Sequence, residues 1–289
     1  MRRILLVPVA LLALVVAGCG SAETAPAVEV DGAFGEQPTL SFPDAEPPAE
    51  LTVDILSPGD GQEVAAGDFL VADYIGQVWG AAESFNDSFA VGQVAGFSLD
   101  QVIGGWQEGL PGTHVGDRVL LSIPPDLGYP EGNPDAGIAE GDTLVFVVDI
   151  LAALGPDDLA AQADAADTGA LADLPVTVSG ALGEQADIQV APDSDEPTEL
   201  TVTTIAAGSG DQVGDEGSVV VSFAATGWDG SDGGSTWDYG APETIPLGLG
   251  TLFDELVGVP VGSRVVALVP ADGETPAIAA VIDVVAHVG

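Results

Sequence analysis

Aromatic side chains are the residues of this chain whose types and spacing could form a functional site. They lie on or beside apolar runs in the first half of the sequence: Tyr74, Phe85, Trp106, Tyr129 and Phe146. Groups for covalent catalysis are scarce, since the chain has two histidines, His114 and His287, and one cysteine, Cys19. No spacing of serine, histidine and aspartate suggests a hydrolase. The residues therefore favour an apolar aromatic cup, although a single aromatic on a strand is more often ordinary core.

The charge of the chain excludes one large class of partners. The formal net charge is −42 over 289 residues, and the only basic side chains are four arginines. Nucleic acid is bound largely by neutralising phosphates with Lys and Arg, so no nucleic-acid partner is expected. A length of 289 residues and a hydrophobic content of 46% are enough for two domains with separate cores.

The first nineteen residues have the pattern of an export signal. Arg2 and Arg3 precede an apolar run, residues 4–17, that is short for a bilayer span. The run ends in Val16-Ala17-Gly18-Cys19, which resembles the lipobox of bacterial lipoproteins. We expect a signal peptide over residues 1–18, a lipid on Cys19, a flexible tether over 19–27, and attachment to the outer face of the cell membrane. The alternative is a secretory signal with an incidental cysteine.

The rest of the chain contains an internal repeat at an offset of about 148 residues. The sequence GAFGEQ at 32–37 matches GALGEQ at 180–185, and VGDRV at 115–119 matches VGSRV at 261–265. The segment VVDI at 147–150 matches VIDV at 281–284. We therefore predict two related domains, residues 28–151 and 176–289, joined by a helical or partly disordered linker over 152–175.

Within each repeat the local signals predict an antiparallel β-sheet and one short helix. The runs at 69–74, 118–123 and 143–151 are rich in aliphatic and β-branched residues, and Gly, Pro and Asp bound them. The helix is expected over residues 100–110, with Asp100 as its N-cap. The fold class is therefore α+β.

Five segments of the first repeat together resemble the FKBP family of peptidyl-prolyl isomerases. They are VADYIG at 71–76, SFNDS at 84–88, FSLDQVIGGWQEGL at 97–110, IPPDLGY at 123–129 and TLVFVVD at 143–149. The resemblance covers residues 67–151. It implies a curved antiparallel sheet wrapped over one short helix, with an apolar pocket between them.

The resemblance also implies a role for each pocket residue. Trp106 would form the floor, and Tyr74, Phe85 and Phe146 the walls. Val102 and Ile103 would form the entrance, where a backbone N–H meets the substrate carbonyl. Tyr129 would donate its hydroxyl to a substrate carbonyl, while Phe97 and Ile138 would complete the substrate-binding surface.

Such a site needs neither metal nor cofactor, because rotation about an X-Pro bond breaks only amide resonance, behind a barrier of about 18–20 kcal/mol. The implied substrates are proline-containing segments of exported proteins, and macrolide inhibitors of the family are possible ligands. One departure concerns the wall: the family usually has Phe-Asp where this chain has Phe85-Asn86. An asparagine can hydrogen-bond Tyr74 but carries no charge. Binding of proline or unfolded segments without turnover, as a chaperone does, is therefore the alternative function, and a purely structural lipoprotein is a third.

The second repeat is expected to be a shortened, degenerate copy. Alignment places Phe223 at the position of Tyr74 and Leu252 at that of Trp106, and it suggests Trp237 for Phe85. Ala280 stands for Phe146, and the loop that carries Tyr129 is cut by about twelve residues. We therefore predict that the second repeat keeps the sheet and does not catalyse isomerisation.

Overall fold

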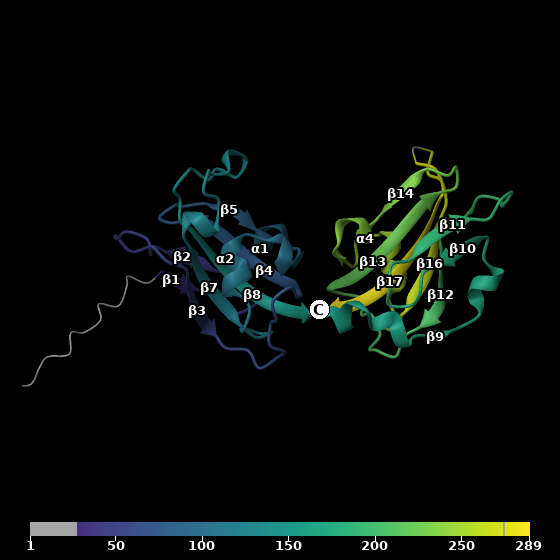
Figure 1. Ribbon diagram of the computed structural model, residues 1–289, viewed down its shortest axis with the longest axis horizontal. Helices are drawn as coiled ribbons and strands as arrows, with labels where there is room; N and C mark the ends of the chain where they lie inside the picture. The colour runs from purple at the N-terminus through teal and green to yellow at the C-terminus, as the bar shows by residue number, and fades with distance from the viewer. Residues whose placement is uncertain (1–27, 274) are drawn as a thin grey trace, which may run out of the picture.

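The computed structural model describes residues 28–273 and 275–289, and it contains two separate large β-sheets (Figure 1). Cys19 and the predicted signal and tether lie outside the described residues. Every strand pair among the described residues is antiparallel, which confirms the prediction of antiparallel sheets with few helices. No described helix is long and apolar enough to cross a bilayer.

The first sheet has the strand order β3-β7-β8-β4-β5, and β6 also pairs with β4. Its elements, with the β1–β2 hairpin, are β1 (Glu29–Asp31), β2 (Thr39–Ser41), β3 (Thr52–Ser57), β4 (Phe69–Val78), β5 (Ser84–Asp87), α1 (Ser88–Val91), β6 (Ala95–Ser98), η1 (Leu99–Gln101), α2 (Gly104–Gly109), β7 (Arg118–Ile123), η2 (Pro125–Leu127), η3 (Pro134–Ala136) and β8 (Leu144–Leu154).

The second sheet repeats this order when it is followed from the opposite edge, and it has one more edge strand, β9. Its path is β14-β13-β17-β16-β12-β9, and β15 also pairs with β13 as β6 does with β4. The elements of this half are α3 (Pro156–Leu159), η4 (Ala161–Asp164), β9 (Ala166–Asp167), η5 (Ala170–Asp173), β10 (Val176–Ser179), β11 (Asp187–Val190), β12 (Thr201–Ala207), β13 (Ser218–Gly227), β14 (Asp232–Ser235), α4 (Thr236–Tyr239), β15 (Glu243–Pro246), η6 (Leu252–Leu256), β16 (Arg264–Val269) and β17 (Ile278–Val288).

Both faces of the first sheet are covered, and this explains the continuous apolar run of β8. Phe146 and Val148 join the core beneath α2, together with Trp106 and Leu110. Val145 and Val147, which alternate with them, pack in a second cluster with residues of the β1–β2 hairpin. The central strand therefore has no solvent face, and it holds the pocket between the sheet and α2.

The predicted single helix over residues 100–110 is interrupted. A 3₁₀ turn covers Leu99–Gln101 and is capped by the Ser98 hydroxyl, which accepts the Asp100 N–H. Val102 and Ile103 are extended, with ψ of 175° and 152°, and helix α2 begins only at Gly104. Asp100 is thus inside the turn rather than at its N-cap, because Ser98 already satisfies the free amide. The break directs residues 102 and 103 toward the pocket.

The segment expected to be a helical or partly disordered linker contains the short helical elements α3, η4 and η5, and it also pairs with both sheets. Strand β8 continues past residue 151 to Leu154, since Leu70 and Phe69 of β4 still provide pairing partners there. Further on, Ala166 and Asp167 form β9 on the edge of the second sheet. Gln162, between these two strands, is fully buried and donates to the Val284 carbonyl at 3.1 Å. The two sheets are therefore connected by packed chain.

Candidate active site

A cavity of about 580 Å³ opens between α2, β4 and β6 of the first half. Nine of the ten predicted pocket residues line it, together with three that were not predicted. The lining consists of Tyr74, Phe85, Asn86, Ala95, Gly96, Phe97, Gln101, Val102, Ile103, Trp106, Tyr129 and Phe146. None of these side chains is charged. The site is therefore an aromatic pocket, suited to an apolar group rather than to an ion.

Trp106 occupies the centre of the ring cluster. Its side chain is 4% exposed, and three other aromatic rings meet it edge to face. The ring centroids lie 5.3 Å from Tyr74, 4.7 Å from Phe97 and 5.1 Å from Phe146. Edge-to-face pairs at these distances stabilise one another beyond simple burial. The pocket is consequently preformed by mutual ring packing.

The Trp106 indole N–H is buried and has no hydrogen-bond partner among the described residues. Leaving a buried donor unsatisfied costs about 1–3 kcal/mol. The Ile103 backbone N–H at the entrance also lacks a partner among the described residues. A ligand at the pocket entrance can therefore satisfy the Ile103 N–H, which the described residues leave open.

The wall opposite α2 depends on a glycine. Phe85 and Phe146 pack edge to face with centroids 5.5 Å apart, and both rings lie directly over Gly76 of β4. A Cβ at this position would stand 2.7 Å from each ring. Only glycine leaves room for both rings, so Gly76 sets the shape of this wall.

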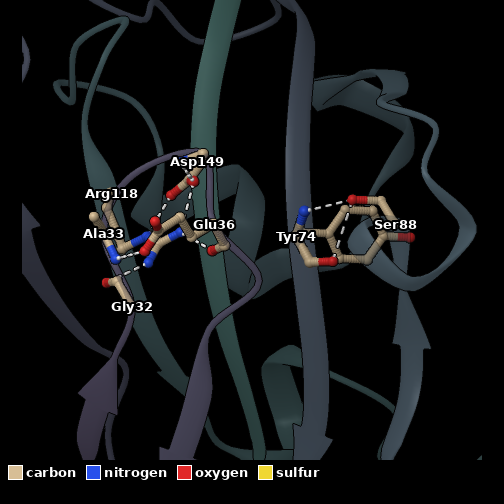
Figure 2. Close-up of polar contacts among 8 residues, drawn as sticks. Gly32, Ala33, Glu36, Tyr74, Ser88, Arg118 and Asp149 are labelled. Atoms are coloured by element: carbon tan, nitrogen blue, oxygen red, sulfur yellow. Dashed lines mark hydrogen bonds and ion pairs between the residues drawn. The ribbon is translucent and has the colours of Figure 1, made fainter.

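Besides the packing of its ring, Tyr74 is held by a hydrogen bond of its backbone. Its N–H donates to the Ser88 hydroxyl at 2.8 Å, and that hydroxyl donates to Asp73 Oδ1 at 2.8 Å (Figure 2 shows the bond from Tyr74 to Ser88). Burial raises the pKa of the Tyr74 phenol, with smaller contributions from Tyr129 and Asp87. The phenol therefore stays protonated at neutral pH, where it is polar but uncharged.

A buried ion pair behind the pocket secures strand β8. Arg118 donates from Nε and Nη2 to the two carboxylate oxygens of Asp149 at 2.6 and 2.7 Å (Figure 2). The same guanidinium donates to the carbonyls of Gly32 and Glu36, both at 2.7 Å. Bidentate pairs of this kind fix geometry as well as charge. Because Asp149 follows Phe146 by three residues, the pair anchors the strand that carries the pocket wall.

Two sequence predictions about the pocket differ from the structure. Ile138 is 2% exposed and belongs to the core cluster rather than to the pocket lining. Its backbone pairs with Asn133, and this short bridge turns the side chain inward. Asn86 is exposed at the pocket rim, and no hydrogen bond joins it to Tyr74 within the described residues. The neighbouring acid, Asp87, instead caps α1 by accepting the Ala90 N–H at 3.0 Å.

Ala95, Gly96 and Gln101 also line the pocket, and they were not among the predicted pocket residues. Gly96 precedes Phe97 on β6, and Gln101 ends the 3₁₀ turn before the entrance residues. The signal available in the sequence was their adjacency to Phe97 and Val102. Small and polar side chains carry no signal of pocket membership by themselves, so only the fold could show it.

The equivalent region of the second sheet lacks the ring cluster. Thr236 accepts the Phe223 N–H at 2.9 Å as Ser88 accepts that of Tyr74, which fixes the register between the halves. In this register Gly233, and not Trp237, stands at the position of Phe85. Trp237 is the counterpart of Phe89. The suggested match of Phe85 with Trp237 is thus wrong, and the second sheet lacks even this wall.

Comparison with known proteins identifies the first half. The model of the family described as FKBP-type peptidyl-prolyl cis-trans isomerase matches residues 61–151. A probable FK506-binding protein of Corynebacterium glutamicum is 37% identical over 41% of this chain and 99% of its own length. An FK506-binding protein of Streptomyces anulatus is 39% identical over 40% of this chain and 97% of its own.

Among solved structures, a peptidyl-prolyl cis-trans isomerase of Pseudomonas syringae pv. tomato is 30% identical, with a TM-score of 0.34, over 36% of this chain and 76% of that one. The family match and the aromatic pocket fall on the same residues, 61–151. The two relatives are covered over nearly their whole length. This chain therefore belongs to the FKBP family and is an FKBP-type peptidyl-prolyl cis-trans isomerase.

Proposed function

We propose that the aromatic pocket of the first sheet is where X-Pro bonds of exported proteins are isomerised. The observation that carries this proposal is the packing of Tyr74, Phe97 and Phe146 around Trp106 in an uncharged cavity. A planar amide is more polar than the twisted amide of the transition state. Transfer into an uncharged pocket therefore penalises the ground state more, and differential binding accelerates rotation.

The roles of individual residues follow from their places in the pocket. Trp106 forms the floor under the proline ring, and Phe85 and Phe146 form the wall. Tyr129 donates its hydroxyl to a substrate carbonyl, and the free Ile103 N–H meets a second carbonyl at the entrance. No proton is transferred, so the pocket residues act by shape and by hydrogen bonds to the backbone of the substrate.

The test is turnover of a proline-containing tetrapeptide by the whole chain, followed by Tyr129→Phe. This change deletes one donor and little packing, and it should lower kcat/KM roughly 2- to 12-fold, since a neutral hydrogen bond contributes about 0.5–1.5 kcal/mol. Thr201→Val also deletes one hydroxyl, at an exposed position on β12 of the second sheet outside the pocket, and should leave turnover of the tetrapeptide unchanged. Equal effects of the two variants would contradict the assignment of Tyr129.

One observation favours the second candidate, binding without turnover. Asn86 stands at the rim where the family usually has an acid, and it does not hydrogen-bond Tyr74 within the described residues. Under this alternative the proline peptide binds, with perturbed resonances for Trp106 and Phe146, while the isomerisation rate stays at its uncatalysed value. Restoring the acid with Asn86→Asp would then create or raise turnover.

Macrolides should occupy the same pocket, as the names of both relatives describe FK506 binding.

We further propose that the protein is a lipoprotein attached through Cys19 to the extracytoplasmic face of the cell membrane. The support is the apolar run that ends in small residues before the single cysteine of the chain. Mass spectrometry of the membrane fraction should find a diacylglyceryl-modified N-terminus at Cys19, and Cys19→Ser should release the protein. A mature soluble form beginning elsewhere would refute this part.

The second sheet is proposed to be a degenerate FKBP-like unit in tandem with the first. Its strand order and its buried pair, Arg264 with Asp283 at 2.6 Å, repeat those of the first sheet. Its pocket position holds Gly233, Leu252 and Ala280 in place of three rings. A whole chain carrying Phe85→Gly and Trp106→Leu should therefore have no residual turnover. Residual turnover in this variant, still folded by circular dichroism, would assign activity to the second sheet.

A further inference from the structure

The two sheets are packed against each other through a buried apolar cluster. It joins Phe69, Val71 and Leu154 of the first half to Val220 and Val285 of the second, and all five are buried. Val71 and Val220 occupy equivalent positions on β4 and β13, one residue before the bulge in each strand. Burial of large apolar side chains favours one fixed arrangement. The second half therefore lies at a defined place relative to the pocket.

This contact extends to the pocket wall itself. Gly96 lines the pocket, and the Thr244 side chain of β15 fills the space that a Cβ on Gly96 would need. Gln101 also lines the pocket, and its Nε2 donates to the backbone carbonyl of Tyr239 at 3.1 Å. A Cβ added at Gly240 would lie 3.5 Å from the same nitrogen, so position 240 also faces Gln101. Two lining residues on this side are thus in direct contact with the second half.

Tyr239 presents a bare aromatic ring beside that contact. It is the last residue of α4, and it is 73% exposed, although its carbonyl is already used by Gln101. Val91, at the equivalent end of α1, is 69% exposed, so the position is a surface site in both halves. Here, however, the backbone of Tyr239 lies one glutamine side chain away from the pocket. An exposed tyrosine at such a place has the character of a binding residue, since it offers apolar area at low entropic cost.

We propose that Tyr239 forms a subsite for the polypeptide that continues out of the pocket on either side of the bound proline. The proposal rests on the proposed function of the pocket. The occupant is an extended, unfolded segment with an apolar or aromatic side chain within a few residues of the proline, because an extended chain advances about 3.3 Å per residue. The degenerate half thereby gives the isomerase a preference for long substrates.

The experiment compares a four-residue and a twelve-residue peptide of the same proline sequence. The whole chain, Tyr239→Ala and Tyr239→Phe are each assayed for kcat/KM, and for Kd by indole fluorescence. We expect Tyr239→Ala to weaken the twelve-residue peptide roughly three- to tenfold and the four-residue peptide less than twofold. Tyr239→Phe keeps the ring and should behave as the wild type. Ile55→Ala, which trims a 50% exposed side chain on the opposite edge strand, is the matched control.

One further measurement, together with the peptide assays, distinguishes a wrong subsite from a wrong pocket. The Tyr239 and Gly240 amide resonances should shift with the long peptide and not with the short one. If the wild type turns over the short peptide but Tyr239→Ala affects both lengths equally or neither, the subsite is wrong and the pocket stands. If the wild type binds neither peptide, the proposed function of the pocket fails, and the subsite fails with it.

Discussion

Replacing Gly76 by alanine should damage the pocket without touching any ring directly. A Cβ at this position would lie 2.7 Å from ring atoms of both Phe85 and Phe146, whereas ordinary contacts begin near 3.4 Å. Each ring would have to retreat by about 0.7 Å, the difference between these two distances. Neither ring can move freely, because they pack edge to face on each other and Phe146 also packs on Trp106.

The expected magnitude has two parts. Overpacking of a close-packed core costs about 1–3 kcal/mol. Alanine has less conformational freedom than glycine in the unfolded chain, and this difference stabilises the folded state by about 0.4–1 kcal/mol. The net loss of stability should therefore be roughly 0–2.6 kcal/mol. Disturbing two aromatic pairs, each contributing about 0.5–1.5 kcal/mol, should lower kcat/KM about 5- to 160-fold.

The assay combines urea unfolding with turnover of a proline tetrapeptide. Ala225→Gly is the reverse change at the equivalent place on β13, and it should cost about 0.5–1 kcal/mol of stability with no effect on turnover. Adding Phe85→Gly to Gly76→Ala removes one clash, so the loss of stability should be smaller than the sum of the two single losses, while turnover does not recover. If Gly76→Ala stays within twofold of the wild type in kcat/KM and unfolds at the same urea concentration, the close packing described for this wall is incorrect.

Two other predictions concern buried charge. Arg118→Met leaves the Asp149 carboxylate without its ion pair and should cost about 3–5 kcal/mol in urea unfolding. Arg264→Met should destabilise the second sheet by a similar amount, yet leave turnover by the folded protein unchanged. Asp73 faces Asp149 across the strands, and burial, together with that carboxylate, raises the pKa of Asp73 despite the Ser88 hydrogen bond. The stability that Asp73 contributes is thus present below pH 3.8, its unfolded pKa, and is lost as the pH rises through the folded pKa. Asp73→Asn should therefore be more stable than the wild type at neutral pH and equal to it below pH 3.8. Urea unfolding at a series of pH values measures this difference in stability. If the extra stability of Asp73→Asn grew on acidification, the assignment would be contradicted.

The positions of the pocket rings could be predicted from sequence because each sits in a short segment with strong local signals. Phe146 lies in an unbroken apolar strand, and Trp106 lies on the buried side of a short helix. The inward turn of Ile138 could not be predicted, since it depends on a single bridge to Asn133 within a loop. Hydrophobic similarity also misled the match of Phe85 to Trp237, because the true register is set by a hydroxyl that bonds a strand amide.

The contact between the halves was beyond sequence reasoning for a different reason. It joins Gln101 to Tyr239, which are 138 residues apart, through a side-chain amide and a backbone carbonyl. Neither group has a sequence pattern of its own, and the pairing exists only once both sheets have formed and packed. The break of the helix at Val102 and Ile103 agrees with the extended preference of β-branched residues, but the apolar spacing that predicted one helix hid it.

The burial of both arginines has a consequence for proteolysis. Trypsin cleaves after Lys and Arg, the chain has no lysine, and Arg118 and Arg264 are each 2% exposed. Within the described residues the folded protein therefore offers trypsin no accessible bond. Cleavage after Arg118 requires the first sheet to open, and cleavage after Arg264 requires the second to open, so the two products report each half separately. When opening and closing are faster than cleavage, the two rates measure the free energy of opening of each half in the intact chain.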